Sequence, residues 1–176
     1  DHSFITTSPT SLNISKKYLK NIHFIMTPVD RNIECFDVFK LKPHNDVFYA
    51  MSHGVNRATL KEGKTDNRVI FLEKLIKKID GIKYDFYGIG KQEPVWGNDF
   101  YKSLLNSKMA LNLSRGEPTK YYSSNRIASL MGNGLLVFID KKVKMNNFFN
   151  PHEIVCYNDI DDLAEKIKFY KKNDKS

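Results

Sequence analysis

A chain of 176 residues with 41% hydrophobic and 27% charged residues has the composition of one globular domain, which excludes an intrinsically disordered protein. The net charge of +8 invites a nucleic-acid interpretation, but only five of the 28 basic residues are arginine and the lysines are scattered along helix faces and the tail. We therefore interpret the charge as a solvated lysine surface and expect no nucleic-acid partner, although an anionic substrate or a membrane surface would suit it.

The cysteines and the hydropathy pattern indicate the compartment. Cys35 and Cys156 are too far apart in sequence for a redox motif or a regular zinc-ligand array, so we expect reduced thiols and no metal site. No apolar run approaches the ~18 residues of a transmembrane helix, and the beginning shows no signal-peptide pattern. We expect a cytoplasmic protein, with peripheral contact at the inner face of the membrane. Because the first residue is not Met, we also expect an upstream portion.

The N-terminal quarter predicts little regular structure. Residues 1–20 are polar and turn-forming, residues 21–27 predict a strand ended by Pro28, and residues 28–46 have the mixed pattern of a connecting segment. We therefore divide the chain into an N-terminal linker with an interdomain strand, residues 1–44, and a main domain, residues 45–176.

From residue 46 onward, strand patterns alternate with helix patterns. The predicted strands cover residues 47–51, 83–90, 108–114, 134–140 and 153–159. The predicted helices cover residues 68–79, 99–107 with a cap at Asn98 or Asp99, a segment that begins near Ser123 or Ser124, and 161–170 with a cap at Asp161. This order predicts an α/β fold, a Rossmann-like parallel sheet with helices on both faces.

Ligands of such sheets bind outside the carboxyl ends of the strands. The loop at residues 114–126 follows one of these ends and carries Arg115, Lys120, Asn125 and Arg126 around the predicted helix start. Backbone amides and the helix dipole favour an anion such as a diphosphate there, with the hydroxyls of residues 123 and 124 as further donors. An equally supported interpretation is that one of these serines only caps the helix while the basic side chains stay in water.

Two other strand ends carry weaker signals. Gly54 lets the backbone approach a ligand, with Ser52, His53 and Arg57 beside it, although a turn glycine next to a surface histidine is the commoner explanation. Gly88 begins a GIG sequence that lacks the full dinucleotide fingerprint, so it predicts no NAD site. Trp96 suits stacking on a base but is more often a packing residue. The usual P-loop, metalloprotease, serine hydrolase and metal–diphosphate motifs are absent from the sequence.

The stretches NLSRGEPTKYYSSNRIASLMGNGLLVFID and FFNPHEIVCYNDIDDLAEKI resemble the C-terminal domain of group 1 glycosyltransferases of the GT-B architecture, especially the spore-maturation-type branch. The likeness covers about residues 45–170. It implies a nucleotide diphosphate sugar as donor substrate, with no cofactor and no metal. It also implies that Arg126 and Gly134 match the family's helix arginine and the glycine before the next strand. Donor binding is thereby expected at residues Ser52, His53, Gly54, Arg57, Gly88, Arg115, Lys120, Ser123, Ser124, Asn125 and Arg126.

One departure from the family pattern keeps alternatives open. Ser129 stands where many members carry a glutamate that contacts the donor ribose or sugar. The resemblance implies transfer to a polysaccharide or other cell-surface acceptor bound by an N-terminal domain of the same protein, which would supply any catalytic base. We therefore expect this chain alone to be inactive. The first alternative is a non-catalytic nucleotide-binding or interaction domain, and the second is an RNA-binding module.

Overall fold

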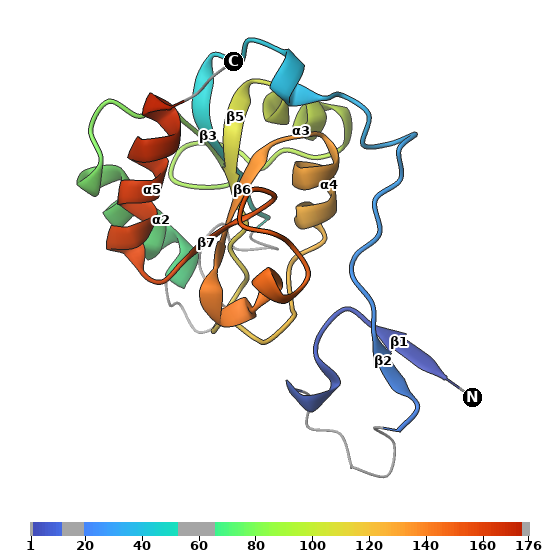
Figure 1. Ribbon diagram of the computed structural model, residues 1–176. Coiled ribbons are helices and arrows are strands. Elements are labelled where there is room, and N and C mark those ends of the chain that lie inside the picture. Colours follow the sequence, from blue (N-terminus) through green and yellow to red (C-terminus); the bar gives the residue numbers. More distant parts are fainter. Residues whose placement is uncertain (1, 12–19, 53–65, 174–176) are drawn as a thin grey trace.

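A parallel sheet forms the centre of the computed structural model, which describes residues 2–11, 20–52 and 66–173 (Figure 1). Five strands pair in the order β4-β3-β5-β6-β7, and every pairing is parallel. Their bounds are β3 Asn45–Ala50, β4 Tyr84–Tyr87, β5 Ser107–Leu111, β6 Leu136–Asp140 and β7 Val155–Tyr157. The predicted α/β, Rossmann-like sheet is therefore confirmed, with strands shorter than most of the predicted ranges.

Helices cover both faces of this sheet, as the sequence predicts (Figure 1). Alternate residues of a strand point to opposite faces, so Val47 and Tyr49 pack with α2 (Asn67–Lys78) and α5 (Ile160–Lys172). Phe48 packs on the other side with α3 (Gly97–Leu104) and α4 (Arg126–Gly132). Among the described residues, no helix is both long and apolar enough to cross a membrane.

The two long helices begin at aspartate caps. The Asp66 side chain accepts a hydrogen bond from the backbone amide of Arg68 at the start of α2. The Asp159 side chain accepts from the amides of Asp161 and Asp162 at the start of α5. These caps satisfy amides that have no partner inside the helix. The cap of α5 is thus Asp159, and the prediction of Asp161 was wrong because that residue already lies in the first turn.

The two short helices begin at residues other than those predicted. The helix α4 starts at Arg126 with Asn125 before it, and no side chain caps it. The Ser124 hydroxyl donates to the Asn112 side-chain oxygen at 2.9 Å and makes no cap hydrogen bond to the helix. The predicted start near Ser123 or Ser124 is therefore too early. The helix α3 starts directly after Trp96, so neither Asn98 nor Asp99 is its cap.

The N-terminal segment runs along the outside of this domain (Figure 1). Its strands β1 (Ser3–Ile5) and β2 (Ile22–Phe24) form a two-stranded parallel sheet. Short 3₁₀ turns lie at Pro9–Ser11, Val38–Lys40, Lys141–Val143 and Met145–Asn147. The backbone amides of Phe36 and Val38 donate to the side chain and the carbonyl of Asn133, at 3.1 and 2.7 Å. The segment is therefore attached where α4 ends, and the domain boundary after residue 44 stays a prediction.

Candidate functional site

The sheet changes direction between β3 and β5. The chain passes from β3 to its neighbour β4 and then returns to β5 on the opposite side of β3. The two connections leave the sheet on opposite faces, so a crevice opens where the carboxyl ends of β3 and β5 lie side by side. This point is where a ligand is expected in an open parallel sheet.

Arg126 joins these two strand ends. Its guanidinium donates one hydrogen bond to the Ala50 carbonyl and another to the Leu113 carbonyl, the latter at 2.7 Å. The guanidinium carbon also lies 4.8 Å from the centre of the Tyr49 ring. The side chain therefore fixes a positive charge at the crevice. These bonds use two of the five N–H donors of the guanidinium, and the buried Nε–H has no hydrogen-bond partner among the described residues.

A cavity of about 410 Å³ opens beside Arg126, and we call it the arginine cavity. Its lining combines two arginines, four polar side chains and several apolar or aromatic groups, with no acidic residue among the described residues that form it. Trp96 is 65% exposed at its rim. A flat ring and an anion both find partners in such a lining. The lining residues are Ala50, Met51, Ser52, Arg68, Val95, Trp96, Phe100, Tyr122, Ser124, Asn125 and Arg126.

Arg68 reaches this cavity from the first turn of α2 and is held by Asp66. The guanidinium donates to both carboxylate oxygens, at 3.0 and 2.7 Å. Burial is the largest single effect and opposes the charge of Arg68, but the hydrogen bonds and charge interactions with Asp66 and Tyr49 together outweigh it, so the pKa of Arg68 is raised. The same hydrogen bond lowers the pKa of Asp66, against an opposing effect of burial. The pair therefore stays ionised near neutral pH, with the arginine charge largely compensated.

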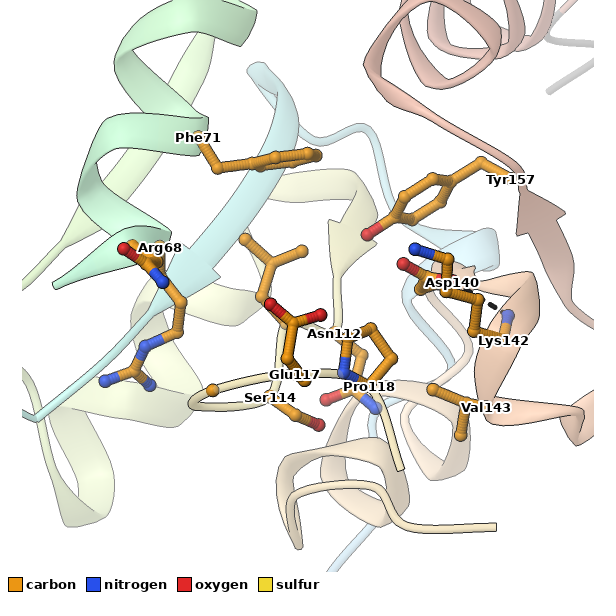
Figure 2. A pocket seen from close by; sticks show the side chains of 13 residues that line it. Arg68, Phe71, Asn112, Ser114, Glu117, Pro118, Asp140, Lys142, Val143 and Tyr157 are labelled. Atoms are coloured by element: carbon orange, nitrogen blue, oxygen red, sulfur yellow. Dashed lines mark hydrogen bonds between the residues drawn. The ribbon is translucent and has the colours of Figure 1, made fainter. Parts of the chain in front are cut away.

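A second cavity, of about 200 Å³, lies on the α2 and α5 side of β5 (Figure 2), and we call it the tyrosine cavity. It is formed by the start of α2, the loop after β5 and the ends of β6 and β7. The end of β5 separates the two cavities, and the hydrogen bond from Ser124 to Asn112 connects their walls. The lining residues are Asn67, Arg68, Phe71, Asn112, Leu113, Ser114, Gly116, Glu117, Pro118, Asp140, Lys142, Val143 and Tyr157.

Comparison with known proteins assigns the family. A family model described as glycosyl transferase-like matches residues 67–176, which is more than half of the chain. The chain belongs to the glycosyl transferase-like family. No curated protein and no solved structure matches it. The matched range of this glycosyltransferase domain begins at α2 and so includes Arg68, Trp96 and Arg126, whereas β3 and Ser52 precede it.

Several residues that the sequence analysis selected meet in this glycosyltransferase domain. Ser52, Ser124, Asn125 and Arg126 all line the arginine cavity. The Ser123 side chain is buried and does not line the cavity. Residues 53, 54 and 57, which complete the predicted loop after β3, lie outside the described residues.

Three other selected residues lie elsewhere. The Gly88 amide donates to the carbonyls of Gln92 and Glu93, which closes the turn after β4. Arg115 is exposed on the loop after β5 and lines neither cavity. The Lys120 ammonium lies 4.7 Å from the centre of the Tyr121 ring, and its carbonyl accepts from the N-terminal segment. The structure therefore does not bring these three residues to the arginine cavity.

Sequence reasoning missed part of the lining. Arg68 was assigned only to a helix pattern, and Tyr122 and Phe100 were not singled out. Trp96 was considered for stacking but was not selected. Its position between a strand end and a helix start was the available signal, because a tryptophan in such a loop has few core neighbours. Arg68 carried no comparable signal, since only the packing of α2 against β3 brings it to the crevice.

Proposed function

We propose that the arginine cavity binds the nucleoside diphosphate part of a nucleotide sugar, and that the chain is the C-terminal donor-binding half of a GT-B glycosyltransferase of the spore-maturation type. The observation that carries this proposal is the cavity lining, in which the fixed charge of Arg126 and an exposed tryptophan face a crevice that no acidic side chain of the described residues lines. The Arg126 charge suits a diphosphate, and Trp96 suits a base. Membership in the glycosyltransferase-like family supports a sugar as the third part of the ligand.

The fixed charge of Arg126 explains how such a site would assist transfer. Negative charge grows on the diphosphate as the bond to the sugar breaks, and groups already oriented toward that charge need no rearrangement. Arg126 is held by two carbonyl groups and by the Tyr49 ring, so its charge is already fixed in place before a ligand binds. We propose that the transfer needs no metal ion or cofactor.

The rest of the reaction would involve other parts of the protein. We propose that an N-terminal domain of the same protein binds a polysaccharide or other cell-surface acceptor and supplies any catalytic base. The chain described here would then bind donor without transferring sugar. Such an enzyme would work in the cytoplasm, in peripheral contact with the inner face of the membrane.

A specific contact favours a second candidate, a nucleotide-binding domain without transferase activity. The Ser129 hydroxyl lies 3.4 Å from a carboxylate oxygen of Glu34, a residue of the N-terminal segment. Ser129 does not line the arginine cavity. By the resemblance to group 1 glycosyltransferases, many members of that family carry a glutamate at this position. In this chain the position is Ser129, and its hydroxyl contacts the N-terminal segment instead of lining the crevice. A protein that has lost the sugar contact in this way would still bind nucleotide.

The test is a titration with UDP, GDP, CDP and their sugars, and with a short RNA, followed by calorimetry. We expect one nucleoside diphosphate to bind. We expect Trp96→Ala to weaken that binding by about fivefold or more, because stacking of a base on an aromatic ring contributes roughly 1–3 kcal/mol. Phe169→Ala is the matched control, since Phe169 is 59% exposed on α5. The control should bind like the wild type.

Three results would decide against the proposal. If no nucleoside diphosphate binds, or if Trp96→Ala binds as well as the wild type, the arginine cavity is not a nucleotide site. If RNA binds with a steep salt dependence and nucleotides do not, an RNA-binding module is the better interpretation. If the full-length protein binds a nucleotide sugar but neither transfers nor hydrolyses it in the presence of candidate acceptors, the non-catalytic alternative is supported.

A further inference from the structure

The tyrosine cavity contains a buried amide with an unused donor. Asn112 stands just after β5 and is 3% exposed. Its side-chain oxygen accepts from Ser124, whereas its side-chain nitrogen has no hydrogen-bond partner among the described residues. Buried donors are almost always paired, because leaving one unpaired costs folding free energy. Asn112 lines the cavity, so a ligand there can supply the missing acceptor.

Two aromatic rings form a wall of the same cavity. Phe71 of α2 and Tyr157 of β7 have ring centres 6.2 Å apart, with an angle of 31° between the rings. Tyr157 is 3% exposed, and its hydroxyl points into the cavity (Figure 2). Burial, together with the charge of Asp140 and the neighbouring Tyr49, raises the pKa of Tyr157. The hydroxyl therefore stays protonated and can donate to a ligand.

The charges around the cavity do not suit an anion. Glu117 and Asp140 both line it, and the Glu117 carboxylate points toward its centre (Figure 2). Arg68 also lines it, but Asp66 compensates the arginine charge through two hydrogen bonds. Lys142 and Glu117 are both exposed and carry opposite charges, so together they add no net positive charge to the cavity. This lining differs from that of the arginine cavity, which includes no acidic side chain among the described residues. The two cavities therefore suit ligands of different charge.

We propose that the tyrosine cavity binds a neutral, hydroxyl-rich ring of pyranose size. Tyr157 and Asn112 supply hydrogen-bond donors, Asp140 and Glu117 supply acceptors, and Phe71 supplies an apolar face for the C–H groups of the ring. A small number of polar groups around an aromatic surface is typical of small-molecule binding sites. The cavity volume of about 200 Å³ is below the roughly 300–1,000 Å³ of pockets for drug-sized ligands, which suits a single ring.

The ring has two possible sources. It is the glycosyl group of the donor, in which case the inference rests on the proposed function, or it is a sugar of a separate saccharide. The shared residue Arg68 and the hydrogen bond between Ser124 and Asn112 make the two cavities neighbours. One ligand can therefore be tested for contact with both.

The test is a titration of the whole chain, followed by amide NMR, with the methyl glycosides of glucose, galactose and mannose. Methyl glucuronide serves as the ligand control because it has the same ring with a negative charge. We expect at least one neutral glycoside to shift resonances of residues around the tyrosine cavity, and we expect the glucuronide to bind more weakly. Tyr157→Phe and Glu117→Gln should each weaken the neutral ligand about three- to tenfold, the usual effect of losing one hydrogen bond.

Matched controls separate these effects from general damage. Tyr170→Phe and Glu165→Gln make the same chemical changes on α5, outside the cavity, and should bind like the wild type. If no neutral glycoside shifts the cavity resonances, or if both cavity variants keep wild-type affinity, the inference is wrong. If only anions bind there, it is also wrong.

Comparison of a nucleotide sugar with its nucleoside diphosphate identifies the source of the ring. If the nucleotide sugar binds more tightly than its nucleoside diphosphate, and Tyr157→Phe abolishes this difference in affinity, the cavity holds the donor sugar. Unchanged binding of the neutral glycoside in the presence of saturating nucleotide sugar assigns it to a separate saccharide. Failure of the proposed function would appear as a missing nucleotide response and would leave glycoside binding unchanged, so the two failures are distinguishable.

Discussion

Replacement of Arg126 by alanine should weaken the fold as well as the site. The guanidinium donates two hydrogen bonds to backbone carbonyls, at Ala50 and Leu113, and lies over the Tyr49 ring. Hydrogen bonds from a charged group contribute about 1.5–3 kcal/mol each, and an exposed cation–π contact about 0.5–1 kcal/mol. Because water can replace part of these contacts at the open crevice, we take the lower values and expect Arg126→Ala to cost about 3–4 kcal/mol.

Such a loss is easily measured. For a domain of this size, each kcal/mol corresponds to roughly 2–4 °C, so the melting temperature should fall by about 6–16 °C. Urea unfolding followed by circular dichroism gives the free energy directly. Arg126→Lys should lose about half as much, because one ammonium group reaches only one of the two carbonyls.

The control is Arg115→Ala, an exposed arginine on the loop after β5. It should cost less than about 0.5 kcal/mol, as surface substitutions usually do. If Arg126→Ala costs no more than this control, the two carbonyl contacts do not stabilise the domain and our account of Arg126 is refuted. If the loss is as large as expected, reduced ligand binding in Arg126→Ala cannot be assigned to a direct contact, and Trp96→Ala is the better test of binding.

Two further predictions concern buried carboxylates. Ser129→Glu places a second carboxylate beside Glu34, which is 7% exposed, and two like charges ~4 Å apart at an effective dielectric of ~20 repel by up to about 4 kcal/mol. We expect Ser129→Glu to lower the free energy of unfolding by about 2–4 kcal/mol, and we expect adding Glu34→Gln to recover most of this loss. A double-mutant cycle measures the recovery, and additivity of the two changes would contradict the contact. The lowered pKa of Asp66 means that its bond to Arg68 contributes stability above the ordinary pKa of 3.8, and this contribution is lost as the pH falls through the lower folded value. Asp66→Asn should therefore be less stable than the wild type at pH 7, with a difference that shrinks in acid unfolding experiments, and a difference independent of pH would argue against this role.

The fold could be predicted because its signals are local. Val47 to Ala50 form an uninterrupted apolar run, which indicates a strand buried on both faces, and both faces are indeed covered. Leu72 and Leu75 recur at helical spacing and lie in the core between α2 and the sheet. The start of α4 was less predictable, because no side chain caps this helix and the Ser124 hydroxyl instead donates to Asn112.

The site could be predicted only in part. The rule that ligands bind at strand ends depends only on the order of strands and helices, and it selected Ser52 and Arg126, which both line the arginine cavity. It did not find Arg68, which enters from a helix on the other side of β3. It also selected Lys120, whose carbonyl accepts a hydrogen bond from the Ser8 amide at 3.1 Å. No local pattern in the sequence reports that contact.

The position of Arg126 depends on both ends of α4. This helix has seven residues and no side-chain cap, and helices this short are marginal without tertiary contacts. At its first residue, the Arg126 guanidinium binds the ends of β3 and β5. At its last residue, Gly132 lies so close to the N-terminal segment that an added Cβ would be 2.7 Å from the Cβ of Glu34 and 2.8 Å from a methyl carbon of Val29. A displacement of that segment would therefore shift α4, and with it the charge that Arg126 holds at the arginine cavity.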